Sequence, residues 1–441
     1  MDPPVVRRLL RLTGCVVAAA CAAGAPVRSS DVFTVRHLPD TALALWTRGA
    51  GGRLAGSPWS GPARYDAANF LMVPLHAAFA GGDADGVRGF AAHARRFLEA
   101  GVPARVEPAS ELSWLQYLYL LSRFVALAEE RGSAELVPSE LPEKLREWVE
   151  AAWIRDTAWS YRGVFPGGIR ERVRWKLDDD TDRPLRASYE DAILDSELFL
   201  FAMAADLRAA RRWIDPGAAP DPLLEDIAQS ARQVFRQRVV RTAEGGWLFQ
   251  PGRWRDHPDF RFACRGEKQL QLSPCAPARV AEDVSHSHRM PLWLRSLAAG
   301  ETAGSKDRGY YLRHLAGLES QFFRRVVVPP DSEFSGWRTR NFMDGSNGIY
   351  RWEYRSLGTG QGYGPYELSG TLVLGWWGFL PGERARSLFR DLAGLFPLDP
   401  AVLRLYAGPH RLELVSPDPR PPVWLSDGTA ELLCRLAAEL E

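Results

Sequence analysis

The chain has 441 residues, a formal net charge of +1, 46% apolar residues and 25% charged residues. This composition is typical of a folded globular protein. The balanced charge argues against a nucleic-acid-binding protein, which needs a basic surface for its phosphate contacts. The length allows two or three ordinary domains or one large single core.

Residues 1–27 resemble an export signal, because arginines precede a short apolar run rich in Ala and Val. Residues 12–15 resemble a bacterial lipobox, which makes Cys15 a candidate lipid anchor, and the alanines before Cys21 offer a rival cleavage site. We expect a periplasmic protein or an outer-membrane-associated lipoprotein; the alternative is a cytoplasmic tail. Residues 28–64, punctuated by Gly, Ser and Pro, are expected to form a wrapping segment.

From residue 65 onward, two kinds of predicted helix alternate. Helices that are apolar nearly all round are expected at 65–80, 111–130, 188–208, 283–299 and 365–380. Helices with one apolar face are expected at 87–98, 145–153, 222–235, 310–327 and 383–396, followed by a last helix at 426–440. An all-round apolar helix must be buried, whereas a striped helix lies at the surface. The pattern predicts an all-α fold of helical hairpins in an inner and an outer ring, with strands at most at 326–330 and 412–415.

Long connections rich in Gly, Trp and Tyr precede three of the inner helices, at 159–187, 245–280 and 334–364. Long ordered loops in a compact domain usually carry function. Within them Cys264 and Cys275 flank a proline-containing turn and are candidates for a disulfide. We expect these loops to converge at the amino ends of the inner helices.

Three polar clusters stand at those amino ends, at 188–191, 281–289 and 366–369. The second is the densest, because Asp283 at an N-cap position is followed within two turns by two histidines and an arginine. A helix amino end also favours anionic groups. The functional interpretation is a proton-transfer and ligand-binding site, and the alternative is helix capping with histidines bonded to neighbouring helices.

Helical hairpins in a double ring with a cleft at one rim resemble the (α/α)6 toroid of six-hairpin glycosidases and polysaccharide lyases. The resemblance covers residues 40–441 and implies a single toroid domain over 65–441 that binds a polysaccharide or oligosaccharide. Residues 347–354 also resemble an aromatic segment of glucuronyl C5-epimerases.

A uronate lyase or epimerase needs a neutraliser for the sugar carboxylate and a base near the C5 proton, while a hydrolase needs two carboxyl groups. The residues that fit such catalytic roles are His286, Tyr350, Tyr354, Glu353, Glu367 and Asp283. The residues that fit substrate binding are Arg289, Asn347, Arg351, Trp337, Trp247, Trp254, Tyr363, Tyr366 and His288. For the loop aromatics, packing within the loop is the alternative to sugar stacking.

The aspartate-rich residues 178–182 resemble the metal-binding motif of terpenoid synthases but lie in a predicted loop, so a solvated acidic loop is the simpler interpretation. We expect an exported carbohydrate-active enzyme of lyase, hydrolase or epimerase type that uses neither metal nor cofactor. The alternatives are a non-catalytic glycan-binding or envelope-binding lipoprotein and a terpenoid-cyclase-like toroid.

Overall fold

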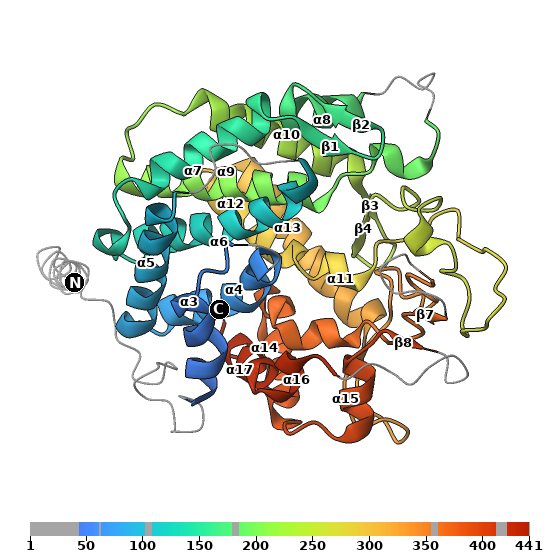
Figure 1. Ribbon diagram of the computed structural model, residues 1–441. Helices are drawn as coiled ribbons and strands as arrows, with labels where there is room; N and C mark the ends of the chain where they lie inside the picture. The colour runs from blue at the N-terminus through green and yellow to red at the C-terminus, as the bar shows by residue number, and fades with distance from the viewer. Residues whose placement is uncertain are drawn as a thin grey trace, which may run out of the picture.

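A computed structural model describes residues 44–60, 63–101, 108–178, 185–353, 360–411 and 421–440. These residues are mainly helical, as expected (Figure 1). The predicted leader with Cys15, the aspartates at 179–182, Tyr354 and the predicted strand at 412–415 lie outside the described residues. Within the described ranges, every helix is too short or too polar to span a bilayer.

The helices reproduce the predicted alternation of buried and one-sided segments. Helix α6 spans Glu111–Glu130, as predicted, and buries nearly all of its side chains, as α9 does. Helices α5, α10 and α14 bury one face each. The α-helices are α3 (Gly52–Ala55), α4 (Ala63–Ala80), α5 (Ala84–Glu99), α6, α7 (Leu141–Glu150), α8 (Gly168–Leu177), α9 (Asp195–Ile214), α10 (Pro222–Arg238), α11 (Val284–Ser287), α12 (Met290–Gly300), α13 (Lys306–Gln321), α14 (Glu383–Gly394), α15 (Pro400–Tyr406), α16 (Val423–Ser426) and α17 (Thr429–Ala437).

The buried helices pack against one another in chain order. Helix α4 contacts α6, α6 contacts α9, and α9 contacts α12, so these helices lie side by side near the centre (Figure 1). The 3-10 turn η10 (Trp376–Phe379) contacts both α12 and α17, and α17 contacts α4. Segments from both halves of the chain therefore share one hydrophobic core.

Two predicted inner helices are broken. The segment at 365–380 forms the 3-10 turns η9 (Ser369–Leu374) and η10, separated by Gly375 at φ 82°. Its three glycines weaken a continuous helix, because each costs about 1 kcal/mol relative to alanine. The segment at 283–299 divides into α11 and α12, since Pro291 has no N–H group and its ring excludes a continuous helix at this point.

The predicted helix at 188–208 begins later than expected. Residues Ser188–Asp191 form a 3-10 turn, residues 192–194 are extended, and α9 begins at Asp195. The side chain of Ser188 accepts a hydrogen bond from the backbone N–H of Asp256 (3.2 Å).

The β-structure of the described residues consists of short antiparallel strand pairs and two isolated bridges, Asp283–Phe342 and Tyr350–Tyr363. The pairs are β1 (Ala158–Ser160) with β2 (Gly163–Phe165), β3 (Val239–Arg241) with β4 (Trp247–Phe249), β5 (Val327–Val328) with β6 (Arg338–Thr339), and β7 (Gln361–Gly362) with β8 (His410–Arg411). Strand β5 lies within the predicted strand at 326–330. The predicted loop at 159–187 instead contains most of the β1–β2 hairpin and all of α8. Strands of three residues carry too little periodicity to be recognised, but the ten-residue α8 was missed although it is long enough to show a pattern.

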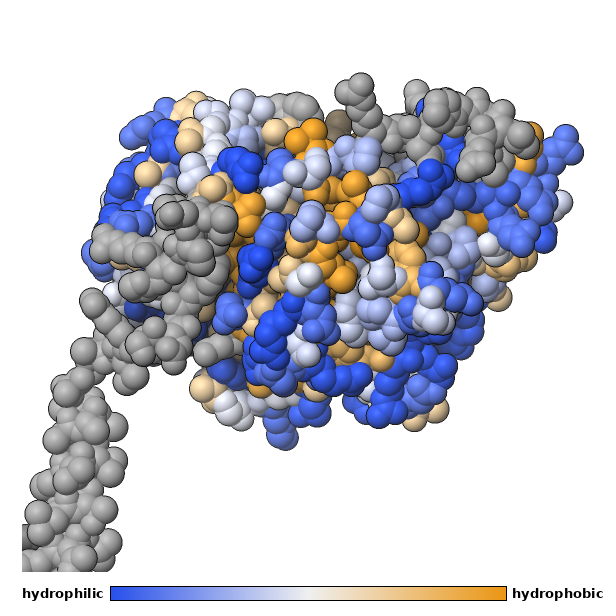
Figure 2. All heavy atoms as spheres, turned by 90° about the horizontal axis from the view of Figure 1, so that it is seen from below, coloured by the Kyte–Doolittle hydropathy of each residue, from blue (hydrophilic) through white to orange (hydrophobic). Residues whose placement is uncertain are grey.

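Cys264 and Cys275 form a disulfide, and Cys434 is a buried free thiol, as the sequence suggested. The disulfide is consistent with an oxidising compartment. Seen from below, the molecule carries mostly hydrophilic side chains, with hydrophobic ones gathered near the middle of that face (Figure 2).

Candidate active site

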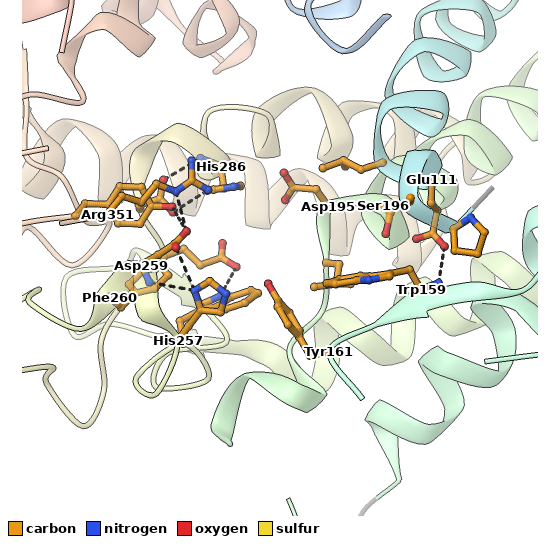
Figure 3. A pocket seen from close by; sticks show the side chains of 18 residues that line it. Glu111, Trp159, Tyr161, Asp195, Ser196, His257, Asp259, Phe260, His286 and Arg351 are labelled. Atoms are coloured by element: carbon orange, nitrogen blue, oxygen red, sulfur yellow. Dashed lines mark hydrogen bonds and ion pairs between the residues drawn. The ribbon is translucent and has the colours of Figure 1, made fainter. Parts of the chain in front are cut away.

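A cavity of about 350 Å³ lies where the amino ends of several helices meet. The first residues of α6 and α9 line it, together with residues around α11, the β1–β2 hairpin and the loop at 254–260 (Figure 3). In this view His286 and Arg351 lie at one end, Trp159 lies at the other, and Asp195 lies between them. Helix amino ends carry partial positive charge, which favours the acidic residues that begin α6 and α9.

Asp283 caps α11 and holds His286. Its Oδ1 accepts hydrogen bonds from the backbone N–H groups of Ser285 (2.9 Å) and His286 (3.2 Å), and its Oδ2 lies 2.7 Å from Nδ1 of His286. Burial alone would raise the pKa of Asp283, but the His286 charge and the hydrogen bonds hold it well below its ordinary value. Burial alone would lower the pKa of His286, but Asp283 and Asp195 raise it. The imidazole is 34% exposed and lines the cavity.

Asp195 is the first residue of α9, and its side chain is 14% exposed. Its Oδ2 accepts a hydrogen bond from Nη1 of Arg289, and Nη2 of Arg289 donates to the hydroxyl of Tyr65. A charge-assisted bond of this kind fixes the carboxylate geometry. Arg289, predicted to bind substrate, thus lies behind the cavity and orients Asp195.

Glu282 lines the same cavity and is almost entirely buried. Its Oε1 accepts hydrogen bonds from Nε2 of Gln250 (2.8 Å) and Nε1 of Trp254 (3.4 Å). Burial, reinforced by the negative charges of Asp195 and Asp283, raises the pKa of Glu282 to about 8. Glu282 is therefore mostly protonated at neutral pH, beside a carboxylate that an arginine holds.

Asp259 organises the wall beside His286. Its Oδ2 accepts hydrogen bonds from the hydroxyl of Tyr350 (3.2 Å) and Nε of Arg351 (2.7 Å), and its carbonyl accepts from the Arg351 N–H (2.9 Å). Burial and the charge of Asp283 raise the pKa of Tyr350 well above its ordinary value. The backbone of Arg351 has φ 53°, a conformation that a residue other than glycine keeps only where surrounding contacts fix it.

Aromatic rings form the rim of the cavity. Trp159 is 38% exposed at the β1–β2 hairpin, and its ring centroid lies 4.8 Å from that of Tyr161. Tyr161 in turn packs edge-on against His257 (5.3 Å) and lies 6.4 Å from Trp254. Exposed, rigidly packed rings suit contact with the apolar faces of sugars.

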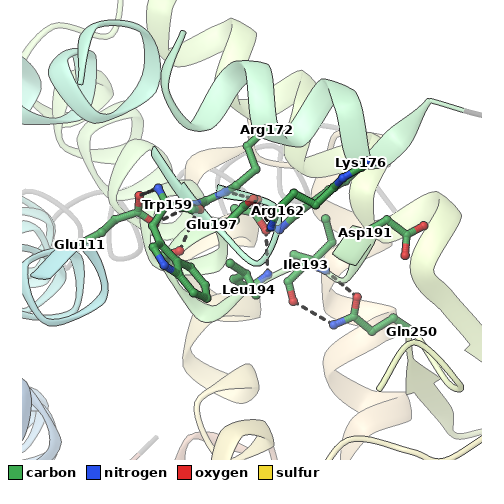
Figure 4. A network of polar contacts seen from close by, with 12 residues as sticks. Glu111, Trp159, Arg162, Arg172, Lys176, Asp191, Ile193, Leu194, Glu197 and Gln250 are labelled. Carbon is green, nitrogen blue, oxygen red and sulfur yellow. Dashed lines mark hydrogen bonds and ion pairs between the residues drawn. The ribbon is translucent and has the colours of Figure 1, made fainter. Parts of the chain in front are cut away.

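A buried ion network supports this rim (Figure 4). The guanidinium of Arg172 donates to Oε1 of Glu111 (2.8 Å), to Oε1 of Glu197 (2.8 Å), to the Ser196 hydroxyl (3.0 Å) and to the carbonyl of Trp159. Arg172 and Glu197 are wholly inaccessible to solvent. Because this single side chain joins α6, α8, α9 and β1, it fixes the positions of three residues that line the cavity.

The structure brings five of the predicted site residues to this cavity: Asp283, His286, Tyr350, Arg351 and Trp254. His288 lies elsewhere, buried with its ring 5.7 Å from that of Trp376, and burial lowers its pKa well below the ordinary value. Trp247 is also buried and donates to the carbonyl of His314 (2.7 Å).

The predicted polar cluster at 366–369 does not line the cavity. Both oxygens of Glu367 accept from the ammonium of Lys268 (2.7 and 2.8 Å), because the disulfide loop places that lysine against it. Asn347 also serves the loop structure, since its Oδ1 accepts from the backbone N–H groups of Asn341 (3.1 Å) and Tyr366 (2.9 Å). The other predicted residues outside the lining are Glu353, Trp337, Tyr363 and Tyr366.

Sequence reasoning did not single out Asp195, Glu282, Glu111 or Trp159 as cavity residues. Glu111 begins a long apolar helix at the predicted residue, and this position is the signal that would have identified it. Asp195 lay inside the predicted helix at 188–208, so its position at the start of α9 was not visible in the sequence. Glu282 stands next to the predicted Asp283 and was overlooked because its neighbours, Gln250 and Trp254, come from a distant loop.

Within the described ranges, no group of three or more His, Cys, Asp or Glu side chains is arranged to hold a metal ion. Comparison with known proteins found no matching family model, no matching curated protein and no matching solved structure.

Proposed function

We propose that the protein is a carbohydrate-active enzyme of glycoside hydrolase type, with Glu282 as general acid and Asp195 as the carboxylate base or nucleophile. The observation that carries the proposal is the pairing of a protonated, buried carboxyl with an arginine-held carboxylate in one aromatic-rimmed cavity. Glycoside cleavage commonly uses two carboxyl groups, one as general acid and one as base or nucleophile.

In this mechanism Glu282 donates its proton to the glycosidic oxygen as the bond from that oxygen to the anomeric carbon breaks. Asp195 then either removes a proton from the attacking water or bonds to the anomeric carbon before water replaces it. In both routes one water is consumed, and Glu282 recovers a proton. The anomer released first, read by NMR, distinguishes the two routes.

A hydrolase is better supported than the predicted lyase or epimerase. Tyr350, the expected base, is fully buried and donates to Asp259, and its raised pKa disfavours the phenolate that a base requires. Asn347, an expected neutraliser, is occupied by backbone N–H groups. The terpenoid-cyclase alternative loses support too, since Asp178 lines a different cavity, beside Arg174.

The contacts α4–α6–α9–α12, with η10 and α17 leading back to α4, support a closed ring of inner helices. We therefore propose that the chain is an (α/α) toroid with its cleft at the inner amino ends. Together with the disulfide, the export-type leader supports action on glycans outside the cytoplasm.

The test is incubation with a panel of neutral and acidic polysaccharides, scored for new reducing ends and for the ultraviolet absorbance of unsaturated products. A hydrolase gives reducing ends without absorbance, and Asp195→Asn or Glu282→Gln abolishes them while Glu353→Gln does not. Absorbance would establish a lyase instead. Binding without any product would leave a non-catalytic glycan-binding protein.

A further inference from the structure

We propose that Gln250 is a positioning residue that directs the proton of Glu282 into the cavity and fixes the distance from Glu282 to Asp195. This inference deepens the proposed function and rests on it. Gln250 lies outside the cavity lining, in the turn after β4, and is 2% exposed.

The first argument concerns the extended segment before α9. Oε1 of Gln250 accepts from the N–H of Ile193 (2.7 Å), and Nε2 donates to the carbonyl of the same residue (2.9 Å) (Figure 4). The paired bonds imitate a strand partner and hold the backbone two residues before Asp195. A carboxamide carries both a donor and an acceptor, so it can bond the backbone N–H and the backbone carbonyl of one residue at the same time.

The second argument concerns the carboxyl group of Glu282. The amide of Gln250 also donates to Oε1 (2.8 Å), and Trp254 donates to the same oxygen (3.4 Å). In a carboxyl that is protonated, as Glu282 is at neutral pH, the oxygen that accepts two N–H donors is the carbonyl oxygen, because the other oxygen carries the proton. No side chain of the described residues donates to Oε2, so the proton belongs on Oε2, the oxygen left to meet the substrate.

The third argument is backbone strain. Gln250 has φ 37°, a conformation that non-glycine residues rarely adopt. Its N–H donates to the carbonyl of Arg238 (2.7 Å), which fixes the residue in this conformation. Strain of this kind persists where it places a side chain that the site needs. Glycine would relieve it but would lose all three side-chain bonds.

The charged groups around Glu282 are Asp195 on α9, Asp283 beside it and His286 on α11. None of them changes in the variant Gln250→Met, which keeps the side-chain length and removes the amide. The hydrogen bond from Gln250 favours the ionised form of Glu282. Its loss should therefore move the titration of Glu282 to higher pH and, through misplacement, lower kcat/KM on the order of tenfold to a hundredfold.

The titration is measured without substrate. At each pH the free energy of unfolding is compared between proteins with and without Glu282→Gln, once with Gln250 and once with Met at position 250. The expected result is a pH-dependent difference that extends to higher pH in the Met background. If that difference covers the same pH range in both backgrounds, the positioning role of Gln250 is refuted, even if glycan cleavage is found. If the pH range shifts but no glycan is cleaved, only the proposed function is refuted.

A second measurement covers the case in which Gln250→Met does not fold. In the wild-type protein labelled at glutamine nitrogens, the side-chain amide signal of Gln250 should move with pH as Glu282 titrates. In Glu282→Gln that movement should vanish. A Gln250 signal that moves equally in both proteins would refute the contact and with it the positioning role. Gln116, whose amide bonds Asn69 (3.0 Å), serves as the internal control.

Discussion

Replacing Glu282 with glutamine removes one titrating group from the cavity and keeps the shape of the side chain. Because burial raises the pKa of this carboxyl from 4.5 to about 8, the folded protein keeps a proton that the unfolded chain releases. The contribution of Glu282 to wild-type stability is fully present below pH 4.5 and is lost as the pH rises toward about 8. At about 1.36 kcal/mol per pKa unit, the full loss is on the order of 5 kcal/mol.

A glutamine side chain at position 282 does not titrate, so Glu282→Gln should gain stability relative to wild type across this pH range. Urea unfolding followed by tryptophan fluorescence, at about pH 5 and about pH 9, measures the difference for each protein. Asp283 and His286 are present in both proteins, so their own contributions to the pH dependence largely cancel. The matched control is Glu353→Gln, at an exposed position. Its free energy of unfolding should differ from that of wild type by the same amount at both pH values. If the free energy of unfolding of Glu282→Gln also differs from that of wild type by the same amount at both pH values, the cavity does not hold a protonated Glu282.

Three further changes test the supports of the site. Arg172→Met should lower the free energy of unfolding by about 3 to 5 kcal/mol in denaturant titration, because it leaves buried carboxylates short of a partner; a loss below about 1 kcal/mol would contradict the network. Trp159→Ala should raise KM about tenfold at unchanged kcat if the ring stacks on sugar, with almost no change in the melting temperature. Reducing the Cys264–Cys275 disulfide, which closes a separation of 11 residues, should cost up to about 3 kcal/mol by the same unfolding assay.

Periodicity and caps predicted the elements that depend on neighbouring residues. The bounds of α6 follow from its continuous apolar run, and Asp221 caps α10 with a 2.9 Å bond to the N–H of Leu223, as the Asp-Pro pair indicates. Asp283 was also recognisable as a cap. Each of these predictions uses contacts within one or two helical turns, where the partners stand close together in the sequence.

The parts that could not be predicted depend on partners far apart in the chain. Glu367 looked like a catalytic acid because nothing near it in sequence neutralises it, yet Lys268, 99 residues away, does. Asp195 lay inside the predicted helix at 188–208, and its contact with Arg289, 94 residues away, left no mark in the sequence around it. The extended segment that delays α9 exists because Gln250 bonds Ile193 from 57 residues away.

Glu282 and Asp283 show why adjacent carboxyl groups end in opposite protonation states. Asp283 receives two backbone N–H donors and lies 2.7 Å from Nδ1 of His286, so the protein stabilises its negative charge. Glu282 receives an amide and an indole on one oxygen only, and the charge of Asp283 opposes its own ionisation. The stabilised charge on Asp283 therefore helps to keep Glu282 protonated. Neutralising Asp283 by Asp283→Asn should consequently lower the pKa of Glu282 and move the basic limb of any pH–rate profile to lower pH, whereas a limb that stays in place would show that burial alone sets the proton on Glu282.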